Sequence, residues 1–243
     1  MKLTPAAVTA LDTLLQTANA VGIEKLIIGN GLIRGVDEKK TVAVVTDKNV
    51  PDLDGKSITV NRIKQLLQRF ALAKSQGDLA LEATVAANGV DISLIDIAGG
   101  KSKSQFRCAS LEAVKGVPKG MSDPAVWQLK VASKMVPIIA QAEASLASTG
   151  VTLASKDGKT VSVELVDTVH KDVLSIELDD EATWIGSTAA ATSFCNKYTT
   201  KALLGLLREA AKGGDMIELK IGQGGLLMVD VAGIGFCTLP HTV

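Results

Sequence analysis

The sequence predicts an α+β fold with two similar domains, each containing two repeats of a helix followed by antiparallel strands. Four segments show helical apolar periodicity, and each precedes short runs in which apolar and polar residues alternate. The pairs Asn30-Gly31, Asn88-Gly89 and Asp157-Gly158 separate such runs, and these dipeptides accept the positive φ of tight hairpins. Strands joined by short turns are antiparallel, so the helices are expected on one face of the sheets.

The first domain is predicted to span residues 1–108. Its first repeat has a helix over residues 4–20 and strands over 25–28, 32–36 and 41–46. Its second repeat has a helix over residues 61–75, with a core face that contains Ile63, Leu66 and Phe70, and strands over 79–85 and 90–97. A strand near residues 104–108 is expected at an edge of the sheet, where its unpaired backbone groups are available to another strand.

Residues 109–125 are predicted to connect the domains, because glycines and prolines there interrupt both helical and strand periodicity. The second domain is predicted to span residues 126–243. Its first repeat has a helix over residues 136–148, strands over 151–154 and 160–166, and a second edge strand near 173–178. Its last repeat has a basic helix from Asn196 to the stop at Gly213-Gly214, followed by strands over 216–221, 226–231 and 234–239.

Basic side chains gather on the second helix of each domain. At about 100° per residue, Lys201, Arg208 and Lys212 fall on one side of the last helix, together with Lys197. One such stripe is usually a solvated face. The chain has 26 basic and 26 acidic residues, so basic stripes on the equivalent helices of both domains are a local concentration of positive charge. This concentration favours contact with phosphates. The candidate DNA-binding residues are Arg62, Lys64, Arg69, Lys74, Lys134, Lys197, Lys201, Arg208 and Lys212.

The kind of nucleic acid follows from the aromatic content. Single-strand binders usually stack bases on exposed aromatic rings, but aromatic residues make up only 3% of this chain. Duplex DNA held through its phosphates, without base readout, is therefore the predicted partner.

Catalysis and cofactors find no support in the sequence. His170 and His241 have no nearby cysteine or carboxylate at metal-ligand spacing. The acidic run at residues 179–181 is typical of a solvated loop, and the glycine-rich run at residues 222–225 lacks the lysine and hydroxyl of a phosphate-binding loop. The chain is therefore predicted to be no enzyme and to need no cofactor.

The cysteines and the N-terminal segment bear on the compartment. Cys108, Cys195 and Cys237 are widely spaced within apolar strands, which predicts buried, reduced thiols. Neither a signal peptide nor an apolar run of about 20 residues is visible. A cytoplasmic protein is expected, in the host cytoplasm if it is viral.

The organisation resembles that of the DNA sliding clamps of the proliferating-cell-nuclear-antigen type and their bacteriophage counterparts. The resemblance covers nearly all of the chain, and the run Asn196-Lys197-Tyr198-Thr199-Thr200-Lys201-Ala202-Leu203 is similar to the family's last inner helix. In that family, helices line a hole around duplex DNA, sheets form the outer wall, and six domains complete the ring. The resemblance implies a homotrimeric processivity factor, and the neutral charge favours a bacteriophage clamp over the commonly acidic eukaryotic and archaeal ones.

The resemblance also implies partners and a site for them. A DNA polymerase and a clamp loader are expected to insert a short apolar motif beside the connector and the last strand. The residues implied there are Val114, Val117, Pro118, Cys237, Leu239 and Pro240. A monomeric accessory protein that holds DNA on one basic face without encircling it remains the alternative.

Overall fold

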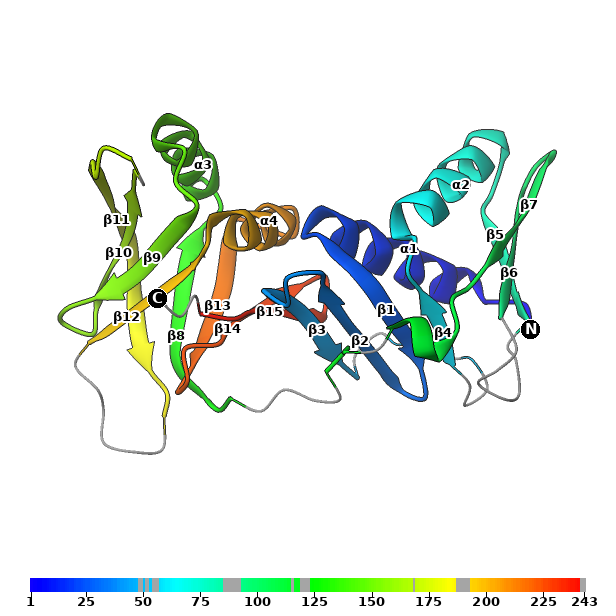
Figure 1. The fold of residues 1–243 in the computed structure, drawn as a ribbon, viewed down its shortest axis with the longest axis horizontal. Coiled ribbons are helices and arrows are strands. Elements are labelled where there is room, and N and C mark those ends of the chain that lie inside the picture. Colours follow the sequence, from blue (N-terminus) through cyan, green and yellow to red (C-terminus); the bar gives the residue numbers. More distant parts are fainter. Residues whose placement is uncertain are drawn as a thin grey trace. The chain divides into compact units, whose positions relative to one another are not determined.

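The computed structural model describes residues 1–47, 50, 53, 57–84, 93–114, 116–118, 123–167, 169–186 and 193–240. The chain forms two compact units (Figure 1), the first from Met1–Lys39 with Ala43–Met121 and the second from Lys40–Val42 with Ser122–Val243. In each unit both helices lie on the same face of antiparallel strands, as predicted. The boundaries at residues 108 and 126 and a separate connector stay predictions.

The first unit has two helices over two antiparallel sheets, ordered β3-β2-β1-β4 and β5-β6-β7. Helix α1 packs on β1 and β5, and α2 packs on β6 and β7. The elements are α1 (Pro5–Ala20), β1 (Ile23–Gly29), β2 (Leu32–Asp37), β3 (Val42–Thr46), β4 (Ser57–Val60), α2 (Ile63–Gln76), β5 (Ala80–Thr84), β6 (Leu94–Gly99), β7 (Ser102–Arg107) and the short 3-10 helix η1 (Leu111–Val114).

Local chemistry fixes the start of the first unit. The Thr4 hydroxyl accepts a hydrogen bond from the Ala7 N–H at 3.3 Å, and Pro5 occupies the first turn, where it costs no helical hydrogen bond. Leu14 and Leu15 are fully buried. Asn30 and Gly31 have φ of 52° and 68°, which confirms the predicted tight turn between β1 and β2. The predicted turn at Asn88-Gly89 lies outside the described residues.

The second unit has one continuous antiparallel order, β12-β9-β10-β11-β8-β13-β14-β15. Helix α3 packs on β8, β10 and β11, and α4 packs on β9 and on β12 to β15. The elements are β8 (Ala125–Ala132), α3 (Met135–Leu146), β9 (Gly150–Ser155), β10 (Thr160–Val166), β11 (Val173–Trp184), β12 (Phe194–Thr199), α4 (Thr200–Ala211), β13 (Met216–Gly222), β14 (Leu227–Val231) and β15 (Ile234–Thr238).

The turn between β9 and β10 is built around Asp157. Its Oδ1 accepts hydrogen bonds from the backbone N–H of Lys159 at 2.9 Å and of Thr160 at 2.8 Å. These bonds to the ionised form lower the pKa of Asp157 to about 2. Gly158 adopts a φ of 71°, which a glycine accepts without strain. The predicted turn at Asp157-Gly158 is therefore confirmed.

The predicted start of the last helix at Asn196 is wrong. Residues 194–199 form strand β12, which pairs with β9 over its whole length, and α4 begins at Thr200. Inward and outward side chains alternate along β12, and Tyr198 is fully buried while Lys197 is exposed. Lys197 therefore projects from a strand and does not belong to the helical stripe. The aromatic and β-branched residues of this run, Tyr198 and Thr199, favour a strand once a partner strand is present.

The expectation of three buried thiols is also wrong for one of them. All three cysteines are free, and Cys108 and Cys237 are buried, but Cys195 is exposed. Because side chains alternate along a strand, Cys195 points to the same exposed side of β12 as Lys197. Burial raises the pKa of the Cys108 thiol to about 12, with Arg62 opposing the shift.

We expect one cysteine of the three to react with a disulfide reagent in the native protein. The thiolate is the reactive form, and only Cys195 is exposed among the three. Titration at about pH 8 should give about one rapid equivalent, and three after unfolding. The Cys195→Ser variant should lose the rapid phase. A rapid phase that persists in this variant would show that Cys108 or Cys237 is accessible.

Candidate nucleic-acid interface

Helix α4 presents basic side chains on the side opposite its packed face. Leu203, Leu206 and Leu207 are buried, as predicted, whereas Lys201 and Arg208 are exposed. At about 100° per residue these two cations lie within one narrow arc of the helix. Lys212 follows at the C-cap, where its Nζ lies 2.7 Å from Glu209 Oε2. Lys201 and Arg208 are thus the cations that α4 offers to an external anion.

The basic residues of the second-helix region have different surroundings from one another. Lys64 is exposed on α2. Lys74 Nζ lies 2.5 Å from Asp12 Oδ2 of α1, so an acid from another helix partly neutralises it. Arg62 and Arg69 turn toward β7 and lie over the Phe106 ring, with guanidinium carbons 4.9 and 5.5 Å from the ring centroid. This helix contains no acid of its own, so the acid that pairs with Lys74 comes from α1. Arg62 Nη1 also donates to Gln65 Oε1 of α2 itself, at 3.4 Å.

The two remaining candidates do not lie on the body of a helix. Lys134 occupies the N-cap position of α3 and is exposed. Lys197 lies along β12, and a Cβ placed on Gly150 would approach its Cε to 2.5 Å. The absence of a side chain at Gly150 therefore leaves room for the Lys197 stem to lie flat against β9. A DNA-binding role for all nine candidates stays a prediction.

The residues implied for partner binding differ in accessibility. Val114, at the end of η1, and Cys237, on β15, are buried at 2% and 6% relative exposure. Val117 and Pro118 are half-buried. Leu239 is 44% exposed just after β15. Leu239 is thus the member of this set that offers a large apolar side chain to another molecule.

A carboxylate occupies the glycine-rich turn between β13 and β14. Asp123 accepts hydrogen bonds from the N–H of Gly224 at 2.8 Å and of Leu226 at 2.9 Å. On the other side of the turn, the buried Tyr198 hydroxyl donates to the Gly225 carbonyl at 2.8 Å. Burial raises the Tyr198 pKa, so the hydroxyl keeps its proton. The Gly224 and Leu226 N–H groups are thus already bonded and unavailable to a phosphate, and no local sequence pattern indicates Asp123 in this role.

Among the described residues, strand β7 and the first half of β11 each have one side that pairs with no other strand, and β4, β5 and β12 also end their sheets. Strand β7 ends the sheet β5-β6-β7. Residues 173–178 of β11 pair with β10 on one side, whereas the pairing of β11 with β8 involves Ala182, Thr183 and Trp184. The predicted edge near residues 104–108 agrees with this order, whereas β11 lies between β10 and β8, and only its residues 173–178 have no β8 partner in the part of the chain that the structure describes. An open edge can accept another strand.

Exposed apolar side chains accompany both edges. Leu72 of α2, the helix that packs on β7, is 56% exposed. Ile138 of α3, the helix that contacts β11, is 46% exposed. Val173, at the start of β11, is 64% exposed. The helices that pack on β7 and β11 therefore each carry an exposed apolar side chain that a partner can cover.

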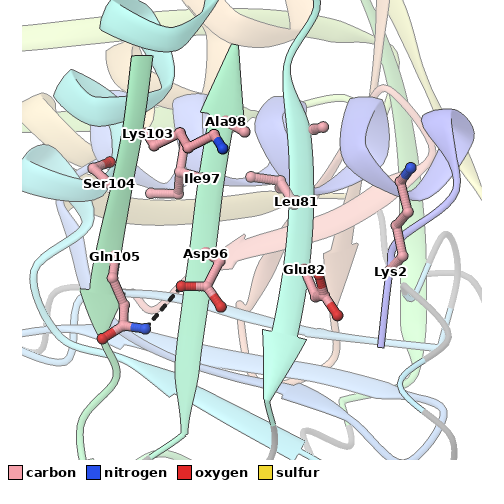
Figure 2. Close-up of a pocket in the computed structure, with 10 residues that line it drawn as sticks. Lys2, Leu81, Glu82, Asp96, Ile97, Ala98, Lys103, Ser104 and Gln105 are labelled. Carbon is pink, nitrogen blue, oxygen red and sulfur yellow. Dashed lines mark hydrogen bonds between the residues drawn. The ribbon is translucent and has the colours of Figure 1, made fainter. Parts of the chain in front are cut away.

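A cavity of about 530 Å³ lies over the three strands β5, β6 and β7 (Figure 2). Glu82 and Asp96 face each other across β5 and β6, and Lys2 and Lys103 flank them on the two sides. Gln105 Nε2 donates to Asp96 Oδ1 at 2.8 Å. Two acidic side chains thus lie side by side between two lysines, so the four charges on this surface balance.

A cluster of metal ligands and a membrane-spanning helix are both absent from the part of the chain that the structure describes. Within it, no three histidine, cysteine, aspartate or glutamate residues gather closely enough to hold a metal ion. None of its helices has the length and apolar character needed to span a membrane.

Comparison with solved structures gives full-length matches. No protein-family model and no curated protein sequence matches the chain. The proliferating cellular nuclear antigen of Entamoeba histolytica superposes with a TM-score of 0.62 at 12% identity, over 99% of this chain and 98% of that one. The PCNA of Thermococcus kodakaraensis gives 0.65 at 14% identity, over 99% of both chains. The chain has the sliding-clamp fold.

A chain of a complex shows the same likeness. A structure of the PCNA2-PCNA3 complex of Sulfolobus tokodaii matches with a TM-score of 0.63 at 13% identity, over 99% of this chain and 98% of that one. The expected clamp fold is therefore confirmed over the whole chain. At these identities the likeness establishes the fold.

Proposed function

We propose that the chain is a DNA sliding clamp, a processivity factor that encircles duplex DNA and tethers replication proteins. The observation that carries the proposal is the exposed pair Lys201 and Arg208 on α4 of a chain with the sliding-clamp fold. The opposite face of α4 is fully packed, so the two cations can contact phosphates while the helix stays in place. The chain acts by binding, with no chemistry of its own.

Sequence-independent contact fits the composition. The chain has 26 basic and 26 acidic residues, so it lacks the overall positive charge that attracts any nucleic acid strongly. A few cations on helices give weak, salt-sensitive attraction to the phosphate backbone. Base edges are read by well-placed polar side chains in a groove, and a clamp that slides must avoid such fixed contacts. The proposed interface therefore contacts phosphates and reads no bases.

We further propose that three copies close head to tail, with β7 of one copy pairing with β11 of the next. The two open edges differ, so their contact is heterologous and must close into a ring or continue as a filament. Strand pairing satisfies the open backbone groups, and it brings Leu72 and Ile138 to an interface where their exposed apolar surface is removed from water. Three chains supply the six domains that complete a ring in the clamp family.

Retention on DNA of different topology tests this function. A closed ring should stay on covalently closed circular duplex after loading and leave promptly once the circle is cut, because sliding off an end needs no opening of the ring. The assay follows labelled protein that co-elutes with DNA at near-physiological salt. Equal loss from circular and linear DNA would contradict encirclement and favour a monomeric accessory protein.

A separate prediction concerns the partner site. Replacing Leu239 with lysine should weaken stimulation of the cognate polymerase, because the change places a charge where an apolar motif is proposed to dock. We expect roughly a tenfold loss of polymerase affinity, since a buried apolar anchor contributes about 1.5–3 kcal/mol. Met216 is also exposed, at 49%, so Met216→Lys is a matched control that should leave stimulation unchanged. If the Leu239→Lys variant stimulates the polymerase as well as the unaltered protein does, Leu239 is not part of the partner site.

We propose that a DNA polymerase and a clamp loader are its partners, with Val114, Val117, Pro118, Cys237, Leu239 and Pro240 as the site that they share. We also propose a bacteriophage origin, which fits the neutral charge of the chain, and the host cytoplasm as its compartment.

A further inference from the structure

The hydrogen bonds around β7 show which of its residues face the open edge. The Cys108 N–H donates to the Ser93 carbonyl at 2.8 Å, in register with the pairing of β6 and β7. Successive residues of a strand direct their backbone groups to opposite edges. The backbone groups of Phe106, like those of Cys108, are therefore directed toward β6. The backbone carbonyls of Gln105 and Arg107 are directed toward the open edge.

Two arginine side chains donate hydrogen bonds to these carbonyls. Arg62 Nη2 donates to the Arg107 carbonyl at 2.7 Å, and Arg69 Nη1 donates to the Gln105 carbonyl. Both guanidinium groups also lie over the ring of Phe106, which is fully buried. Each arginine thus has a charge-assisted hydrogen bond and an aromatic ring to hold it at the edge.

We infer that Arg62 and Arg69 cap the open edge of β7 in the unassembled chain and must leave it when a strand of a second copy pairs there. This inference rests on the proposed function, because it assigns a control to the same assembly edge. A carbonyl at a sheet edge points in the plane of the sheet, and the next strand lies about 4.8 Å away. A guanidinium group within hydrogen-bonding distance of that carbonyl stands in the space of the incoming strand.

The caps have two consequences. They protect an exposed edge from pairing with unrelated strands, a hazard that proteins commonly limit with charged side chains at edges. They also couple assembly to DNA binding, because pairing at β7 releases two guanidinium groups, and a released guanidinium group can contact a phosphate. Arg62 and Arg69 therefore act on assembly first and become available to DNA only in the ring.

The test is a double variant that removes the donors and keeps the packing. Arg62→Met with Arg69→Met retains unbranched apolar stems over Phe106 and loses both caps. Its control is Lys64→Met with Lys101→Met, which removes the same charge from exposed lysines of the same unit. Sedimentation velocity over a concentration series compares both variants with the unaltered protein. Thermal unfolding of each variant establishes that it is folded before assembly is compared.

The Arg62→Met and Arg69→Met variant should reach half-assembly at a roughly tenfold lower protein concentration, because pairing no longer displaces two charge-assisted hydrogen bonds. The control should assemble like the unaltered protein. Assembly of the double variant at the same or a higher concentration than the control would overturn the inference, because it would mean that the arginines do not oppose pairing.

A second measurement works on the monomer and is independent of any ring. In ¹⁵N spectra of arginine side chains, hydrogen bonds to carbonyls slow guanidinium rotation, so separate Nη signals should appear for Arg62 and Arg69 and vanish in the double variant. Arg208, which is exposed on α4, provides the freely rotating reference. Free rotation of the Arg62 and Arg69 guanidinium groups would show that they do not cap the edge of β7 and would overturn the inference. A protein that never assembles yet shows hindered rotation would contradict the proposed ring and support the caps.

Discussion

Replacing Ser175 with proline is expected to leave the protein monomeric where the unaltered protein forms trimers. The Asp167 N–H donates to the Asp172 carbonyl at 2.9 Å, in register with the β10 and β11 pairing. By the alternation of backbone groups, Ser175 therefore directs its N–H away from β10. Proline at this position removes one donor of the open edge and is tolerated within the existing sheet.

Light scattering coupled to size exclusion measures the outcome. The unaltered protein should give a mass near three times 25.3 kDa at tens of micromolar, and Ser175→Pro should give one chain mass. Ser175→Ala keeps the N–H and should assemble normally. Ile176→Pro removes a bond to β10 instead and should lower thermal stability, which separates loss of the edge from loss of the sheet. A trimer of Ser175→Pro would show that this edge is not the interface.

Reversing the charge of Lys201 and Arg208 together is expected to abolish stable association with duplex DNA. Glutamate at both positions replaces attraction to phosphates with repulsion, and the buried leucines of α4 are untouched. For each phosphate that the variant no longer neutralises, the slope of log affinity against log salt should become shallower by about 0.9. Fluorescence anisotropy with a duplex at several salt concentrations measures both affinity and slope.

The matched control lies on the turn between β9 and β10. Lys156 and Lys159 are exposed there, so Lys156→Glu with Lys159→Glu changes the net charge equally without altering a helix. This control should keep most of its DNA affinity and its full salt slope. If the two double variants bind DNA equally weakly, the attraction depends on total charge and α4 is no specific interface.

The helical and hairpin elements could be predicted because their signals are local. The apolar face of α4 with Leu203, Leu206 and Leu207 follows from helical periodicity. The turn at Asn30-Gly31 follows from residues that accept positive φ. The open edge at β7 follows from its place at the end of a repeat. Each of these signals is contained within a short stretch of the chain, so the sequence was sufficient.

The run from Asn196 to Thr199 could not be assigned locally, since its residues suit a helical stripe as well as a strand. Pairing with β9, which lies far earlier in the chain, decided for the strand and moved Lys197 off the helix. The same pairing exposed Cys195. Long-range backbone hydrogen bonds of this kind cannot be predicted from the periodicity of apolar residues within a short segment.

The sequence alone determined the fold class, the presence of four helices, the edge position of β7 and the set of basic residues. Only the tertiary structure decided which of those cations are exposed, as Lys201 and Arg208 are, and which already have partners, as Arg62, Arg69 and Lys74 have. The reason is physical: periodicity assigns a side chain to a face of its own helix. The carbonyl, ring or carboxylate that binds it comes from another element, whose position depends on packing of the whole unit.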